Sequence, residues 1–236
     1  MTGSGHALFE LVWKLALASL ALAHAATAAV APPCERCTLD VPRQLDHDHP
    51  GPVPLLVVLH GDREAATAAT RRWRAAALAR GWVLLGLQCP TQEGCKDSWW
   101  KWDGDPAWLL AQIAKVEASV AIDPKRVYLV GWSGGATYLG RHAQAWEATI
   151  AALVFHGGGH QPSEAECVGR LPAYFLVGDR NPLHELMKDL RAYFDRCGQD
   201  VAWDLVRGGD HDKEERALDR AKALAILDWL AARPKP

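Results

Sequence analysis

The chain has 236 residues, of which 49% are hydrophobic and 23% are charged, and its formal net charge is −2. This composition is typical of one folded domain with a buried core, and it excludes a disordered chain. Acidic and basic residues are mixed along the sequence, so no basic block indicates a nucleic-acid partner.

The first residues predict a segment that is separate from the folded domain. Residues 15–23 read LALASLALA, an apolar run of the length found in signal peptides, and small-x-small cleavage patterns follow at 23–25 and 26–28. We expect residues 1–31 to be a signal peptide or leader and 32–236 to be the folded domain. A retained anchor is an alternative, because the uncharged stretch 15–33 is near the lower limit for a membrane span, and a buried helix is another. Cleavage or anchoring would make the domain periplasmic or secreted.

Six cysteines fit export, because their number is even and disulfides persist in oxidising compartments. Six cysteines allow 15 pairings. Proximity favours Cys34–Cys37, Cys89–Cys95 and Cys167–Cys197. The first pair, which has the CxxC spacing, could instead be half a zinc site or a redox pair, but no second CxxC or histidine pair completes a zinc site. It also lacks the strand-to-helix context of a redox motif. We therefore predict neither a metal nor a cofactor.

Apolar runs then alternate with helical patterns along the chain. Runs that are apolar on both faces are typical of buried parallel strands covered by helices. The predicted strands are 55–59, 82–87, 127–130, 152–155, 174–177 and 201–206, and the predicted helices are 65–80, 106–120, 134–146, 182–197 and 213–232. This alternation predicts the α/β class, with a doubly wound, mostly parallel sheet and helices on both faces. The segment 157–171 is too short to form a large lid domain.

Residues 131–135 (GWSGG) carry the strongest functional signal, because they follow a predicted strand and open a predicted helix. G-x-S-x-G in this context is a nucleophile elbow, whose tight turn tolerates almost no flanking side chain. It would hold the Ser133 hydroxyl above a helix N-terminus, where the N–H of Gly134 can stabilise an oxyanion. An ordinary glycine-rich turn is the alternative interpretation.

A serine nucleophile needs a base and an acid that orients the base. His211 follows the last predicted strand, where the order serine–acid–histidine places the base; a solvated surface histidine is the alternative. The acid is expected in 178–182 (GDRNP), where Asp179 is the only carboxylate. Asn181 is its rival, since an amide can orient an imidazole but cannot stabilise imidazolium as a carboxylate does.

The segment 60–62 (HGD) ends the first long predicted strand. We expect the N–H of Asp62 to be the second oxyanion donor, with Gly61 allowing the loop to approach the elbow. His60 is interpreted as a buried histidine that holds this loop by hydrogen bonds, in preference to a second base. The segment 156–160 (HGGGH) is interpreted as a flexible wall of the site, because its glycines argue against helical His ligands for a metal.

Tryptophan is unusually frequent, with 11 copies, and several of them cluster within 99–108. Aromatic faces at the sheet edge could stack a phenolic group, a sugar or a flat polymer, whereas the alternative is that they close a small core. The predicted substrate-binding residues are Trp132, His60 and Trp100.

The motifs at 59–61 (LHG), 131–135, 178–182 and 209–211 (GDH) together resemble the α/β-hydrolase superfamily over roughly residues 50–232. Within it, the chain is most similar to secreted esterases such as polyhydroxybutyrate depolymerases and feruloyl esterases. Many relatives carry Asp where this chain has Asn181.

The resemblance implies a serine hydrolase that cleaves small or polymeric carboxylic esters through an acyl-enzyme. The mixed charge predicts no nucleic-acid partner, and cleavage of the leader would leave no stable membrane association. A peptidase of the same fold and a catalytically impaired binding homologue are the alternatives.

Overall fold

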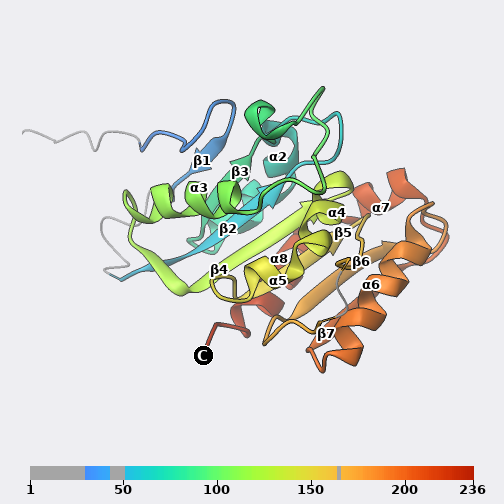
Figure 1. The fold of residues 1–236 in the computed structure, drawn as a ribbon. Helices are drawn as coiled ribbons and strands as arrows, with labels where there is room; N and C mark the ends of the chain where they lie inside the picture. The colour runs from blue at the N-terminus through green and yellow to red at the C-terminus, as the bar shows by residue number, and fades with distance from the viewer. Residues whose placement is uncertain (1–29, 43–50, 164–165) are drawn as a thin grey trace, which may run out of the picture.

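The computed structural model describes residues 30–42, 51–163 and 166–236 (Figure 1). The predicted leader, residues 1–31, lies almost entirely outside the described residues, so that prediction remains open. Among the described helices, none is both long and apolar enough to span a membrane.

The described strands form one seven-stranded sheet in the order β1-β3-β2-β4-β5-β6-β7. The strands are β1 Thr38–Asp40, β2 Val53–Leu59, β3 Val83–Leu87, β4 Ile122–Trp132, β5 Ala152–His156, β6 Ala173–Gly178 and β7 Val201–Val206. Neighbours from β3 to β7 pair in parallel, and β1 alone is antiparallel, at the edge beside β3. Leu59 of β2 lies opposite Gly131 of β4, and Trp132 lies opposite His156, so the carboxyl ends of the central strands are level.

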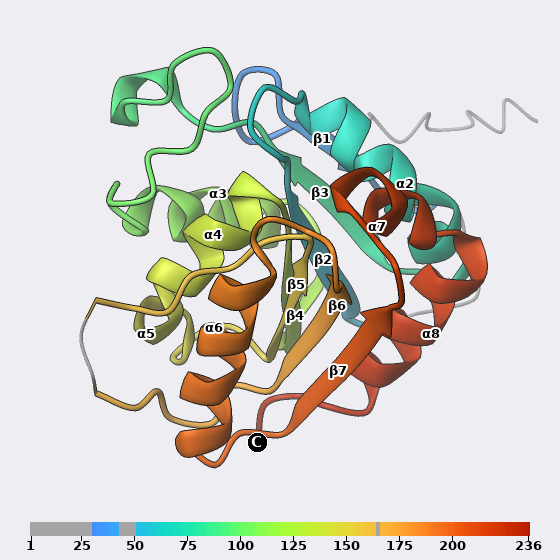
Figure 2. The same ribbon diagram turned by 90° about the vertical axis from the view of Figure 1, so that its right-hand side faces the viewer.

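Helices cover both faces of this sheet (Figure 2). They are α2 Ala66–Ala79, the 3-10 turn η2 Thr91–Glu93, α3 Ala107–Glu117, α4 Gly134–Arg141, α5 Ala143–Trp146, α6 His184–Arg196, α7 His211–Ala217 and α8 Arg220–Ala231. One core cluster packs α3, α4, α5 and α6 against one face, and a second packs α2 and α8 against the other. The alternation along β2 explains the two layers, since Leu55 and Val57 join the first core and Leu56 and Val58 join the second.

The predicted fold class is confirmed, and the differences concern element boundaries. The edge strand β1 was not predicted, because three residues (TLD) are too few for a periodic pattern. The predicted helix 134–146 is interrupted at His142, and the predicted helix 213–232 is two helices. Asp210 and Asp219 each accept a hydrogen bond from a first-turn N–H, so each caps a separate helix.

Three disulfides join Cys34 to Cys37, Cys89 to Cys95, and Cys167 to Cys197. The pairing predicted from proximity is therefore confirmed. The second bridge lies in the loop that follows β3, at the carboxyl edge of the sheet where the predicted site residues gather.

Candidate active site

Ser133 occupies a sharp turn between β4, which ends at Trp132, and α4, which begins at Gly134. Its φ of 50° and ψ of −113° are strained for a residue with a side chain. The flanking glycines are required by close packing. A Cβ on Gly131 would lie 2.5 Å from the backbone nitrogen of Ala136, and one on Gly135 would lie 2.6 Å from the carbonyl oxygen of His60. The turn thus has the geometry of a nucleophile elbow.

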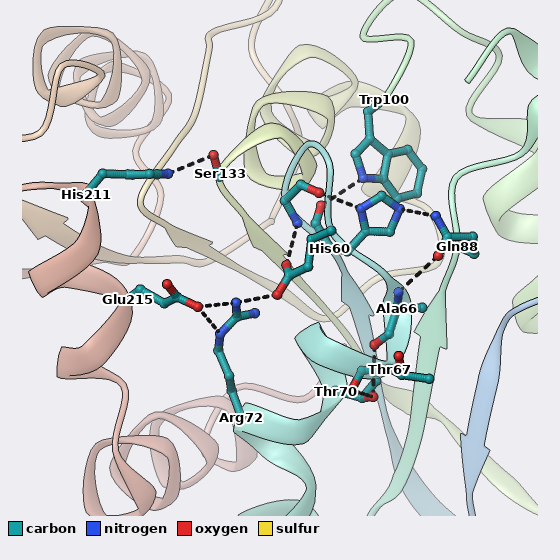
Figure 3. Close-up of polar contacts among 12 residues, drawn as sticks. His60, Ala66, Thr67, Thr70, Arg72, Gln88, Trp100, Ser133, His211 and Glu215 are labelled. Atoms are coloured by element: carbon teal, nitrogen blue, oxygen red, sulfur yellow. Dashed lines mark hydrogen bonds and ion pairs between the residues drawn. The ribbon is translucent and has the colours of Figure 1, made fainter. Parts of the chain in front are cut away.

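His211 approaches this serine from the first residue of α7, whose N-terminus is capped by Asp210. Its Nε2 lies 3.0 Å from Ser133 Oγ, within hydrogen-bond distance (Figure 3). Its ring stacks on the indole of Trp132 at 4.5 Å, with 12° between the ring planes. Burial lowers the pKa of His211, which favours the neutral imidazole that can accept a proton. The structure therefore brings together the residues predicted as nucleophile and base.

The other ring nitrogen of His211 faces Asn181 and not Asp179. Asn181 Nδ2 lies 3.0 Å from His211 Nδ1, and the Asn181 side chain is buried. Asp179 is exposed and makes no described contact with the imidazole. The chain turns after Gly178, whose carbonyl accepts the N–H of Asn181 at 3.3 Å, so the third residue of the loop points inward. This corrects the prediction that Asp179 contacts the histidine.

A second side chain, Glu214, completes this side of the imidazole. It is fully buried in α7, and its Oε2 lies 3.9 Å from His211 Nδ1 and accepts a hydrogen bond from the Asn181 amide. Its Oε1 accepts the N–H of Gly178 at 2.8 Å. Burial raises the pKa of Glu214 to about 7, against the opposing effect of these hydrogen bonds. Sequence reasoning missed this residue, although its position three residues after His211 places both on one face of a helix.

The loop that follows β2 reaches the elbow on its other side. A Cβ on Gly61 would lie 3.3 Å from Ser133 Cβ, and the carboxylate of Asp62 lies against the Cα of Gly134. The Asp62 carboxylate accepts the N–H of Trp100 at 3.1 Å. The two predicted oxyanion donors, the N–H groups of Asp62 and Gly134, therefore belong to segments that touch beside the serine.

The three residues predicted to bind substrate, His60, Trp100 and Trp132, are all buried. His60 Nε2 accepts the N–H of Cys89 at 3.0 Å. The indole of Trp100 donates to the His60 carbonyl at 2.8 Å (Figure 3). Trp132 packs under His211. These contacts fit the structural interpretation of His60, and contact of the three side chains with substrate stays a prediction.

An ion-pair network that was not predicted from the sequence lies against Trp132, on the side of the site formed by α2 and α7. Arg72 of α2 pairs with Glu64 and Glu215 (Figure 3). Its guanidinium lies 5.4 Å from the centroid of the Trp132 ring. Glu64 in turn accepts the N–H of Gly61 at 3.0 Å. The network thereby connects α2, the Gly61 loop and α7, although these segments are distant in the sequence.

Comparison with known proteins identifies the fold. No protein-family model matches the chain, and no curated relative matches it. Solved structures do: a thermostable esterase (19% identity, TM-score 0.66) over 84% of this chain, and esterase PE8 (18%, TM-score 0.60) over 82%. The chain spans 59% of the first protein and 97% of the second. The fluorophosphonate-binding serine hydrolase FphF of Staphylococcus aureus is also similar (15% identity, TM-score 0.61; 82% of this chain and 91% of that one).

The chain has the α/β-hydrolase fold.

A hollow of about 480 Å³ opens between the tryptophan-rich loop, the end of α4 and the loop after β5. Trp99 and Trp102 line it and are 42% and 41% exposed, unlike the buried Trp100. Arg141 and His160 line the opposite side. The exposed indoles of Trp99 and Trp102 therefore offer aromatic contact area in this hollow, which the buried Trp100 also lines.

Proposed function

We propose that this α/β-hydrolase is an exported serine hydrolase that cleaves carboxylic esters through an acyl-enzyme. One observation carries the proposal. The hydroxyl of the strained elbow residue Ser133 lies 3.0 Å from Nε2 of His211, whose lowered pKa favours the neutral base.

The arrangement supports two-step acyl transfer. Ser133 Oγ attacks the ester carbonyl carbon while His211 Nε2 takes its proton, and the carbonyl π electrons move to the oxygen. The N–H groups of Gly134 and Asp62 are the proposed donors to that oxyanion. The tetrahedral intermediate then collapses, the C–O bond to the alcohol breaks, and His211 protonates the leaving alkoxide. A water molecule, deprotonated by His211, releases the acid and restores Ser133.

Several features support the finer parts of this proposal. Three disulfides and the apolar N-terminal run support export to the periplasm or the medium. The described residues of 157–171 contain neither helix nor strand, and the absence of a lid element there supports an open site that polymeric esters could reach. The exposed Trp99 and Trp102 support a flat or aromatic group on the substrate, consistent with the polyhydroxybutyrate depolymerase and feruloyl esterase resemblance.

The proposal is tested by turnover on p-nitrophenyl esters of increasing acyl length and on peptide anilides, with wild type and Ser133→Ala side by side. We expect ester turnover that Ser133→Ala abolishes. Turnover of the anilides without turnover of short esters would establish the peptidase alternative. Absence of both, in a protein that melts cooperatively, would establish the binding homologue.

A further inference from the structure

The side-chain amide nitrogen of Asn181 lies within hydrogen-bond distance of more groups than it has protons to donate. An amide NH₂ group has two protons, and its nitrogen accepts no hydrogen bond. In the structure, Asn181 Nδ2 faces three groups: the Gly157 carbonyl at 3.2 Å, Glu214 Oε2, and His211 Nδ1 at 3.0 Å. Its Oδ1 is already occupied, because it accepts the N–H of Leu183 at 2.8 Å. The amide is therefore held in this orientation and cannot turn its oxygen to the histidine.

This orientation decides which form of His211 can act. If Asn181 donated a proton to Nδ1, the neutral imidazole would carry its own proton on Nε2 and could not accept one from Ser133. For His211 to be a base, its proton must sit on Nδ1, and both amide protons must go to the two oxygens. The Nδ1–H group then faces an anionic acceptor at only one described position, Glu214 Oε2, at 3.9 Å.

We propose that Glu214 is the positioning carboxylate of the site, which keeps the Nδ1 proton on His211 and stabilises its imidazolium from behind the Asn181 amide. This inference rests on the proposed hydrolase function. In this role Glu214 replaces the acid that the resemblance expects in the loop after β6, where this chain has Asn181. It lies on the same helix as the base, α7. Its charge stays in place throughout the cycle, while the proton that His211 takes from Ser133 passes to the leaving alcohol.

The structure fixes Glu214 as firmly as a positioning residue requires. Its carboxylate accepts from Gly178 N–H and from Asn181, and its backbone carbonyl accepts Nε2–H of the buried His156 at 2.9 Å. A carboxylate enclosed in this way has few other orientations to adopt. A glutamate on an exposed helix face would have neither of these partners, the N–H of Gly178 at the end of β6 and the buried His156.

Other charged groups around the His211–Glu214 pair come from three elements. Arg72 of α2 lies under the neighbouring Trp132 with its partner Glu215, Asp212 is exposed beside His211 on α7, and His156 ends β5. Burial lowers the pKa of His156 to about 3, so that residue stays neutral through the pH range of interest.

The pair gives a characteristic pH dependence. Burial lowers the pKa of His211 from its ordinary value of 6.5, so the imidazolium becomes neutral imidazole at a pH below 6.5. The pKa of Glu214 is raised to about 7. Because the active form needs neutral His211 and ionised Glu214, the rate should rise with pH up to a plateau, with an apparent midpoint near 7 that belongs to the pair.

The test compares wild type, Glu214→Gln and Asp212→Asn, measuring ester kcat/KM and the rate of fluorophosphonate labelling from pH 5 to 9. Asp212→Asn is the matched control, because it removes an equal charge from an exposed position of the same helix. We expect Glu214→Gln to lower the plateau by about 100-fold, within the roughly 10⁴-fold loss known for removal of an orienting carboxylate. Its acid limb should also move to lower pH, whereas the control should stay within about threefold of wild type.

Rescue provides a second readout that a merely structural role would not give. Adding Asn181→Asp to Glu214→Gln places a carboxylate next to His211 Nδ1, and we expect it to restore at least a tenfold higher plateau. A Glu214→Gln variant with the wild-type plateau and profile would overturn the proposal. If that variant does not fold, Asn181→Asp alone decides: a plateau within about threefold of wild type means that Glu214 already supplies the charge, and a plateau raised more than about tenfold overturns the proposal. Wild type that neither turns over esters nor labels at Ser133 would instead refute the hydrolase function.

Discussion

Replacing Gly131 by alanine tests whether the elbow is as tight as the structure indicates. The added Cβ would lie 2.5 Å from the nitrogen and Cα of Ala136 and 2.6 Å from the carbonyl carbon of Gly135. All three are backbone atoms in the first turn of α4, so no side chain can rotate away to relieve the clash. The first turn of α4, and with it Ser133, must move.

Overpacking of this kind costs about 3 kcal/mol of unfolding free energy, the upper end of the usual range for added methyl groups. In a domain of this size, that corresponds to a fall in Tm of roughly 6–12 °C. A shift of Ser133 by about 1 Å relative to His211 would lower kcat by about 100-fold. The two effects should therefore appear together in Gly131→Ala.

Thermal melting and ester turnover of the purified protein measure both quantities. The matched control is Gly51→Ala, because a Cβ at that exposed glycine meets no atom within 4 Å. We expect the control to keep its activity and to shift Tm by about 2 °C or less. A Gly131→Ala variant that melts and turns over like the control would refute the elbow geometry.

Two further predictions concern the acid loop and the disulfides. Asp179→Asn should keep kcat/KM within about twofold of wild type, because its side chain is exposed and the imidazole faces Asn181; a tenfold loss would return the role of acid to Asp179. Changing Cys167 and Cys197 together to serine opens a loop with a sequence separation of 30, which should cost about 3–4 kcal/mol through the greater entropy of the unfolded chain. A calorimetric Tm unchanged in this variant, or in wild type under reductant, would contradict it.

Much of the fold could be predicted because its physical causes are local in the sequence. Strands buried on both faces must be apolar throughout, as 55–59 and 152–155 are, and that pattern predicts a parallel sheet covered by helices. The elbow could be predicted for the same reason, since the glycines around Ser133 are required by a turn of five residues. The position of His211 directly after the last strand likewise predicted that it lies near Ser133, at the carboxyl edge of the sheet.

The remaining parts of the site depend on contacts between distant segments. Asp179 and Asn181 are two residues apart, and only the turn after Gly178 decides which of them is buried. Glu214 resembles any acidic residue of a surface helix until the packing of α7 against the end of β6 encloses it. The pairing of Arg72 with Glu215 spans 143 residues and leaves no periodic pattern to find.

The most direct test of the account is covalent labelling of the serine itself. Wild type and Ser133→Ala are incubated with a fluorophosphonate, and the labelled peptide is identified by mass spectrometry after proteolysis. We predict one adduct per chain, on the peptide that contains Ser133, and none in the variant. An unlabelled wild type, or an adduct that persists in Ser133→Ala, would contradict the claim that the elbow holds an activated nucleophile.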